Sequence, residues 1–353
     1  MEILQAKQSL DKVIDKARVH LYKPIQIAEI LYQDRVHADI DLADLNTYRN
    51  ASKKWRDVIC RKFLGRTSTS SARYQDDVFN ENAIPLEVLT CLGEVNRKKK
   101  GVVEAYIYAK FLQRFSQMAI GLDYSSTHDR LTFRLDEFIA KFWNEPGLKR
   151  SIDKIYEIVV YTLFSTLIDA LDVTVEIHIN PQKTALLNEF EDFAKRVIQL
   201  DTINKRVTVT GKIHRVGVTN ASDRGLDMWA NFGLAIQIKH LSLTEELAEN
   251  IVSSVTSDRI VIVCKDSEEK IIVSLLNQIG WKSKIQSIIT ERDLLKWYEQ
   301  ALRGSYSSTI GDKVLSNLIE EIKTEFPTTD HEEFSNFYKS RGYDKMIDSD
   351  WKS

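Results

Sequence analysis

The sequence predicts an α/β protein: a mixed central sheet flanked by helices, with a largely helical domain preceding it. Segments in the first half of the chain have apolar residues at helical spacing. In the second half, helical segments alternate with short strand-like runs. The run 259–264, Arg-Ile-Val-Ile-Val-Cys, has the continuous apolar character of a central strand. Residues 144–147, Asn-Glu-Pro-Gly, form the clearest break in the chain.

That break divides the chain into a helical N-terminal domain (1–147), an α/β domain (148–305) and a C-terminal helical extension (306–353). In the first domain we expect helices at 2–20, 24–36, 50–64, 102–119 and 131–143, and a short element at 41–46. In the α/β domain we expect helix 151–170, strand 173–179, helix 183–200, strand 206–218, a hairpin within 223–240, helix 244–254, strand 259–264, helix 267–279, strand 282–289 and helix 291–302.

Composition sets few limits on function. The 353 residues carry a formal net charge of −2, but basic residues can still gather on one face. The three cysteines lie far apart and lack the CxxC spacing of a zinc site. No apolar run reaches the roughly 20 residues of a membrane span, and the first residues lack a signal-peptide pattern. We therefore expect a soluble cytoplasmic protein with no membrane partner.

The segment from the helix at 50–64 to the loop at 65–74 carries many basic residues and almost no acidic ones. The apolar stripe of this helix is Trp55, Val58, Ile59 and Phe63, and a hydroxyl-rich loop follows it at 65–74. Basic side chains and hydroxyl groups are what phosphate oxygens bind, so we expect DNA contact here. The candidate DNA-binding residues are Lys53, Lys54, Arg56, Arg61, Arg66 and Arg73. An ordinary solvated helix face is the alternative, and the run 97–100 is equally a solvated turn or a phosphate contact.

The helix at 151–170 holds a single charge in its central part. Between residues 155 and 168 the only charged residue is Glu157. A helix that is apolar all round is buried all round, and a lone buried carboxylate is costly unless it is paired or binds a metal. Glu157 is therefore a candidate metal ligand or active-site acid, against the alternatives of a structural ion pair or a hydrogen-bonded carboxyl.

The helix at 183–200 is amphipathic. We expect its stripe of Leu186, Phe190, Phe193 and Val197 to face inward. Glu189 and Glu191 border this stripe and are weaker candidates for an active-site acid.

The hairpin within 223–240 holds several candidate catalytic residues close together. Its first strand bears Asp227, residues 231–233 (Asn-Phe-Gly) supply a turn, and its second strand bears Gln237 and Lys239 on one face. A carboxylate, an amide oxygen and an ammonium then meet at one place. This combination predicts a divalent-metal site with a lysine beside it, suited to metal-assisted phosphodiester hydrolysis. Because the spacing of Asp, Gln and Lys is a loose pattern, the alternative to a metal site is an ordinary hairpin with a solvated polar face.

The order of helix acid, Asp and (Glu/Gln)-x-Lys resembles the PD-(D/E)xK nuclease superfamily, and more closely the HaeII-type restriction endonucleases. The stretches that carry the closer resemblance are 71–77 (Ser-Ala-Arg-Tyr-Gln-Asp-Asp), 154–161 (Lys-Ile-Tyr-Glu-Ile-Val-Val-Tyr), 215–233 (Arg-Val-Gly-Val-Thr-Asn-Ala-Ser-Asp-Arg-Gly-Leu-Asp-Met-Trp-Ala-Asn-Phe-Gly), 236–243 (Ile-Gln-Ile-Lys-His-Leu-Ser-Leu) and 277–281 (Asn-Gln-Ile-Gly-Trp). The resemblance spans nearly the whole chain. It implies a PD-(D/E)xK core and a homodimeric type II restriction endonuclease that cuts double-stranded DNA with Mg²⁺ at a GC-rich palindrome. RGCGCY, cut to leave 3′ overhangs, is the site the resemblance implies, with a cognate DNA methyltransferase as genetic partner.

In that pattern, Asp227 and Glu157 would hold Mg²⁺ together with Gln237 and the backbone carbonyl of Ile238. Lys239 would orient or help to deprotonate the attacking water. Gln237 stands where most members have Glu or Asp. Because an amide oxygen brings no charge, a single and more weakly held metal follows.

Two alternatives remain at this stage. A structure-specific or modification-dependent DNase of the Mrr or junction-resolvase kind would use the same chemistry. A DNA-binding regulator with an inactive α/β domain would use the basic segment alone.

Overall fold

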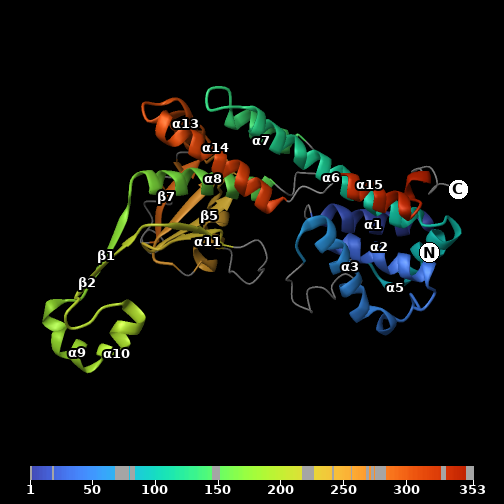
Figure 1. Cartoon of the computed structure of the whole chain (residues 1–353), viewed down its shortest axis with the longest axis horizontal. Coiled ribbons are helices and arrows are strands. Elements are labelled where there is room, and N and C mark those ends of the chain that lie inside the picture. Colours follow the sequence, from blue (N-terminus) through green and yellow to red (C-terminus); the bar gives the residue numbers. More distant parts are fainter. Residues whose placement is uncertain are drawn as a thin grey trace. The chain divides into compact units, whose positions relative to one another are not determined.

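The structure of the chain is a computed structural model, drawn in Figure 1. It describes residues 2–17, 20–67, 79, 84–144, 152–216, 226–240, 242–255, 257–267, 270–271, 274, 284–326 and 331–346. These residues form two compact units, a helical unit up to residue 155 and from residue 319, and an α/β unit of residues 156–216 and 222–318. Mixed α/β architecture with a helical N-terminal part is thus confirmed.

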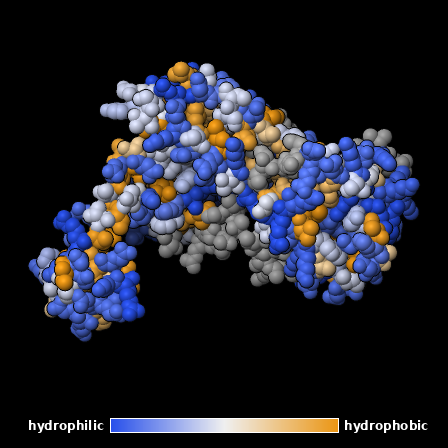
Figure 2. All heavy atoms as spheres, in the orientation of Figure 1, coloured by the Kyte–Doolittle hydropathy of each residue, from blue (hydrophilic) through white to orange (hydrophobic). Residues whose placement is uncertain are grey.

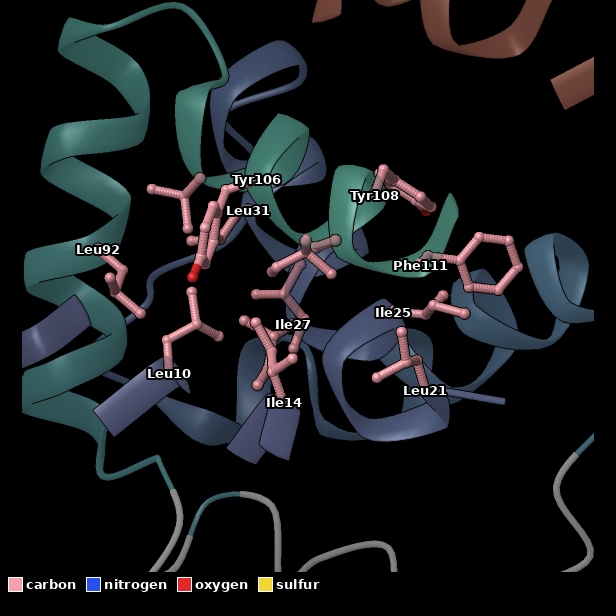
Figure 3. Packing of buried hydrophobic residues seen from close by; sticks show 14 of the residues in the cluster. Leu10, Ile14, Leu21, Ile25, Ile27, Leu31, Leu92, Tyr106, Tyr108 and Phe111 are labelled. Carbon is pink, nitrogen blue, oxygen red and sulfur yellow. The ribbon is translucent and has the colours of Figure 1, made fainter. Parts of the chain in front are cut away.

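The helical unit is built from α1 (Ile3–Lys16), α2 (Tyr22–Val36), η1 (Leu45–Thr47), α3 (Arg49–Leu64), α5 (Leu86–Lys98), α6 (Val102–Thr127), α7 (Leu135–Trp143), α15 (His331–Ser340) and η5 (Tyr343–Lys345). α2 lies in its centre and is buried on nearly every side, because it packs against α3, α5 and α6. Figure 3 shows Ile25, Ile27 and Leu31 of α2 among apolar side chains of the neighbouring helices. α6 continues past its predicted end at 119 because Tyr124 packs on Phe133, with ring centroids 5.6 Å apart.

The C-terminal segment, expected as a helical extension at 306–353, contains α14, α15 and η5. Residues from 319 onward belong to the helical unit. Phe334 of α15 packs edge-on against Phe63, with centroids 5.2 Å apart, and Arg341 donates two hydrogen bonds to Glu29 at 2.6 and 3.0 Å. Both partners come from the first 63 residues, so the two ends of the chain share one core.

The α/β unit contains the strands β1 (Thr174–His178), β2 (Arg206–Thr210), β3 (Ile213–Arg215), β4 (Met228–Ala230), β5 (Leu234–Lys239), β6 (Ile260–Cys264) and β7 (Ile285–Thr290). Its helices are η3 (Pro181–Lys183), α9 (Thr184–Glu189), α10 (Glu191–Phe193), η4 (Ala194–Ile198), α11 (Glu245–Ser254) and α13 (Glu291–Arg303). α8 (Ile152–Ala170) and α14 (Ser307–Glu325) contribute residues to both units. The predicted helix at 267–279 lies mostly outside the described residues.

One sheet has the order β3-β4-β5-β6-β7. β3, β4 and β5 pair antiparallel, whereas β5, β6 and β7 pair parallel, so the sheet is mixed, as predicted. α11 packs on one face, against Ala235, Ile260 and Ile262. Side chains of alternate residues, among them Ile236 and Val261, are buried on the opposite face. α8 is tied to α13 by the hydroxyl of Tyr298, which donates to the carbonyl of Val159 at 2.8 Å.

The predicted strand at 173–179 forms, but outside this sheet. β1 pairs only with β2, in an antiparallel ribbon with Val175 opposite Val209 and Ile177 opposite Val207. Both strands are largely exposed, because the ribbon is covered by little else. The predicted helix at 183–200 is broken into α9, α10 and η4 at the far end of the ribbon (Figure 1). Its four stripe residues are exposed, so the inward orientation expected for them is wrong.

Within the described residues, none of the helices combines the length and apolar character that a bilayer crossing requires.

Candidate active site

The candidate site is built on the hairpin of β4 and β5. Gly233 closes the turn with a φ of +84°, a left-handed conformation that glycine adopts without a steric penalty. Asn231 fixes the turn against the preceding loop, because its side chain accepts from the Lys212 backbone N–H and donates to the carbonyl of Thr210, both at 2.8 Å. Sequence analysis predicted this hairpin, and the structure confirms it.

Asp227 immediately precedes β4 and lies opposite the second strand. Met228 pairs with Ile236, so Asp227 falls beside Gln237. Its Oδ2 accepts hydrogen bonds from Gln237 Nε2 and from the Ile238 backbone N–H, the latter at 2.7 Å. Two donors on one carboxylate oxygen hold this side chain at the start of the hairpin.

Gln237 is the most deeply buried polar side chain of the hairpin, with 2% of its surface exposed. Its amide nitrogen donates to Asp227, but its Oε1 is buried and has no hydrogen-bond partner among the described residues. A buried amide oxygen without a donor costs free energy. Placed beside a carboxylate, it is also an acceptor that a hard divalent cation would satisfy.

Lys239 lies two residues further along β5 and shares a face with Gln237. In the parallel register, Gln237 pairs with Ile262 and Lys239 with Cys264, and both partners belong to the cluster that packs on α11. Lys239 is half-buried at the carboxyl end of the strand. The structure therefore brings Asp227, Gln237 and Ile238 into direct contact, with Lys239 at the end of the same row.

Glu157 is buried in α8, with 6% of its surface exposed, as the composition of that helix suggested. Neither hydrogen bond that joins Asp227 to the second strand involves Glu157. The cluster on the Gln237 face of the sheet contains no residue of α8. Glu157 thus belongs to the same α/β unit as the hairpin, and its role as second acid stays a prediction.

The two weaker acids lie elsewhere. Glu189 is exposed at the end of α9, and Glu191 accepts from the Thr202 hydroxyl at 2.6 Å and from its N–H at 3.1 Å. These Thr202 hydrogen bonds lower the pKa of Glu191. Both side chains are carried by the short helices beyond the ribbon, so neither reaches the Asp227 hairpin.

Among the described residues, no three His, Cys, Asp or Glu side chains are grouped so as to hold a metal. The presence of Gln237 in place of an acid accounts for part of this, because it removes one carboxylate from the hairpin. Cys264, the register partner of Lys239, does not add a ligand. Burial, followed by the charges of Asp266 and Asp293, raises the pKa of its thiol to about 12.

One surface feature beside the hairpin was not found by sequence analysis. His214 of β3 and Trp229 of β4 are exposed cross-strand neighbours whose rings stack with centroids 4.5 Å apart. Trp229 lies two residues from Asp227, so the two side chains share a face of the hairpin. The two-residue period of a strand was enough to place Trp229 on the face of Asp227. The position of His214 beside Trp229 depends on the register between β3 and β4, which the sequence does not give.

Some of the candidate DNA-binding residues in and after α3 are exposed, whereas others form contacts within the protein. Arg56 is 2% exposed and donates to Asp57 at 2.7 Å and to Gln26 at 3.3 Å, so its assignment to DNA is wrong. Arg66, which follows α3, is half-buried and donates to the carbonyls of Thr324 and Glu325 at the end of α14, so a DNA contact by Arg66 stays a prediction.

Lys54 and Arg61 are exposed on α3 and Lys53 is half-buried, whereas Arg73 lies outside the described residues. Val58 was predicted to lie on the inward stripe, but it is exposed between Lys54 and Arg61. Arg97 of the second basic run forms an ion pair with Asp34 at 2.5 Å, which makes a phosphate contact by Arg97 costly.

Comparison with known proteins gives two kinds of match. The family model described as HaeII restriction endonuclease matches residues 6–343. The chain belongs to the HaeII restriction endonuclease family. It is 65% identical to the type II restriction enzyme HaeII of Haemophilus aegyptius over 98% of this chain and 99% of that protein. It is 59% identical to the type II restriction enzyme NgoBI of Neisseria gonorrhoeae over the same shares of the two chains.

This member of the HaeII family is therefore a type II site-specific deoxyribonuclease. No solved structure matches the chain.

Proposed function

We propose that this enzyme hydrolyses double-stranded DNA at a short GC-rich palindrome, RGCGCY by family resemblance, in a Mg²⁺-dependent reaction at the Asp227–Lys239 hairpin. The observation that carries the proposal is the pairing of Asp227 with Gln237, whose buried Oε1 finds no hydrogen-bond partner in the part of the chain that the structure describes. An acidic oxygen beside an unsatisfied amide oxygen is a suitable pair of ligands for Mg²⁺.

The order of elements supports a PD-(D/E)xK core. In chain order, α8 is followed by β1, the short helices and β2, and then by the antiparallel strands β3, β4 and β5, by α11 and by the parallel strand β6. Asp227 immediately precedes β4, and Gln237-x-Lys239 lies on the neighbouring antiparallel strand β5, which is the order of the superfamily pattern.

Asp227, Gln237 and the backbone carbonyl of Ile238 would hold the metal, with Glu157 as the second acid. The metal, when bound, supplies Lewis-acid polarisation of the scissile phosphate and a lower pKa for an attacking water. Asp227 is kept in place for this task by the N–H of Ile238.

Lys239 would act on the attacking water and on the charge that develops at the phosphate. Its half-buried position at the end of β5 limits competition from solvent while leaving the ammonium accessible to a substrate. A fixed cation at this point stabilises negative charge in the transition state more than in the ground state.

DNA would be held by the exposed part of the basic segment. Lys54 and Arg61 lie on the same face of α3, about two turns apart, and Lys53 is next to Lys54. Arg73 is retained as a candidate from the sequence. The exposed His214–Trp229 pair next to Asp227 would add a contact close to the scissile phosphate. Double-strand cleavage of a palindrome is suited to a homodimer, and self-protection would require a cognate DNA methyltransferase.

The decisive experiment is digestion of unmethylated phage DNA by the wild type and by Lys239→Ala, with Mg²⁺ and with EDTA. Lys212→Ala serves as a matched control, because Lys212 is an exposed lysine next to β3. We expect discrete bands with the wild type and the control in Mg²⁺ only, and DNA that is bound but uncut with Lys239→Ala.

End-sequencing of the bands would give the recognition site. Turnover by Lys239→Ala within about tenfold of the wild type would refute the role of Lys239. Cleavage that persists in EDTA would refute the metal requirement.

A further inference from the structure

The apolar stripe that sequence analysis predicted to face inward is exposed to solvent. We define the tip as residues 181–205, carried by the ribbon of β1 and β2. Leu186, Phe190, Phe193 and Val197 recur at helical spacing along the tip, yet each is 53–62% exposed. Ile203 of the same tip is 87% exposed. In Figure 2, apolar side chains are visible on the ribbon and the tip among hydrophilic ones.

The tip has little core of its own. Its buried apolar residues are Leu187, Ala194 and Leu200. All three cysteines of the chain lie outside it, so no disulfide holds it. A segment of this size buries too little surface to be stable without such a support or a partner. The pattern of the sequence therefore fits a helical segment whose apolar face is covered in the functional assembly.

The charge of the tip argues against DNA as the covering partner. Residues 181–205 contain four basic side chains, Lys183, Lys195, Arg196 and Lys205, against four acidic ones, Glu189, Glu191, Asp192 and Asp201. A surface that binds the phosphate backbone has a clear excess of positive charge. A neutral surface with equal numbers of both signs is instead able to pair with a copy of itself.

The exposed apolar area is large enough for a protein interface. From their exposed fractions, the four stripe residues with Ile198 and Ile203 present roughly 600 Å² of apolar surface, the upper end of what single soluble proteins leave uncovered. With its polar rim, the patch approaches the roughly 800 Å² per partner of a stable interface.

We propose that the tip is a self-association surface, on which the stripe of one chain packs against the same stripe of a second copy around a two-fold axis. The inference rests on the proposed function, because one chain brings one Asp227–Lys239 hairpin and cutting both strands at a palindrome calls for two. A contact of identical patches closes after two copies, as a dimer requires. Each lysine or arginine of the rim can then face an acid of the other tip.

The test is sedimentation velocity of the full-length wild type and of Phe193→Asp at protein concentrations from about 0.1 to about 50 µM, where dimers with micromolar dissociation constants dissociate measurably. Phe193 is more than half exposed, so the substitution should leave the fold of the chain intact. Leu4→Asp is the matched control, because Leu4 is an equally exposed apolar residue in α1 of the helical unit.

We expect a dimer for the wild type and for Leu4→Asp, and a dissociation constant raised by at least about 100-fold for Phe193→Asp, since both copies lose an aromatic anchor. A monomeric wild type, or a Phe193→Asp variant that dimerises as tightly as the wild type, would overturn the proposal. Loss of DNA affinity with unchanged association would assign the tip to DNA and overturn it equally.

A plasmid assay separates this inference from the proposed function. Phe193→Asp should accumulate nicked circles where the wild type produces linear DNA, because single copies still cut one strand. Lys239→Ala should remain dimeric yet cut neither strand. If Lys239→Ala still cleaves DNA while Phe193→Asp is monomeric, the catalytic role of Lys239 is refuted, whereas the proposal that the tip is the self-association surface is retained.

Discussion

The identity of residue 237 offers the sharpest test of the hairpin. Gln237→Glu keeps the size of the side chain but replaces the donor to Asp227 with a second carboxylate oxygen in a position that is 2% exposed. Without metal, the variant loses a hydrogen bond to a charged group, worth about 1.5–3 kcal/mol. It also brings two like charges to roughly 4 Å, a repulsion of about 4 kcal/mol at an effective dielectric constant near 20.

Proton uptake by one of the two carboxyl groups relieves part of this penalty. We therefore expect Gln237→Glu to lower the free energy of unfolding by about 2–4 kcal/mol in EDTA at neutral pH. In saturating Mg²⁺ the second carboxylate becomes a ligand, and the deficit should shrink to within about 1 kcal/mol. The Mg²⁺ concentration for half-maximal cleavage should fall at least about tenfold, because the site regains a negative charge.

Urea unfolding with and without Mg²⁺ measures the first effect, and a cleavage titration measures the second. Gln286→Glu is the matched control, since Gln286 is exposed on β7 and accepts from Arg259 at 2.8 Å. It should change stability by less than about 0.5 kcal/mol in either buffer. A loss for Gln237→Glu that Mg²⁺ does not reduce would refute a metal at this hairpin. No loss in EDTA would refute the contact between Gln237 and Asp227.

Three further predictions concern other parts of the molecule. Glu157→Gln should raise the Mg²⁺ concentration for half-maximal cleavage, and an unchanged titration would remove Glu157 from the metal site, with neither acid of the tip available to replace it. Arg341→Met should lower the free energy of unfolding in urea by about 3–5 kcal/mol, because it leaves Glu29 charged and buried; a change below about 1 kcal/mol would contradict this. Burial, the largest cause, raises the pKa of the Cys60 thiol and that of Cys264, so iodoacetamide at pH 8 should leave both unlabelled until the chain unfolds, as mass spectrometry can count. The free energy of unfolding should in turn fall as the pH rises above about 8.5, where the unfolded thiols ionise and the folded ones do not.

Local patterns were sufficient for most elements of the fold. The strand of continuous apolar residues at 259–264 and the turn at 231–233 depend on residues close together in the chain, and both formed as predicted. The alternation of β5 also placed Gln237 and Lys239 on one face, because side-chain direction in a strand follows from position alone.

The N-terminal helix α3 shows where a local pattern misleads. Its spacing correctly directed Ile59 and Phe63 inward, but it also predicted a buried Val58 and an exposed Arg56. Arg56 is buried because Gln26 of α2 and Asp57 satisfy its guanidinium, and the sequence does not reveal such a partner. Burial of a charge is decided by what a distant segment supplies.

The sequence by itself determined the family, the α/β character and the residues of the hairpin, since each depends on the identity of nearby residues. Only the tertiary structure decided that Asp227 meets Gln237 across the strands and that the last residues complete the core of the first helices. It alone left the stripe of Phe190 and Phe193 exposed. An amphipathic pattern states that a face must be covered, whereas the register and packing of the whole chain decide whether the chain itself covers it.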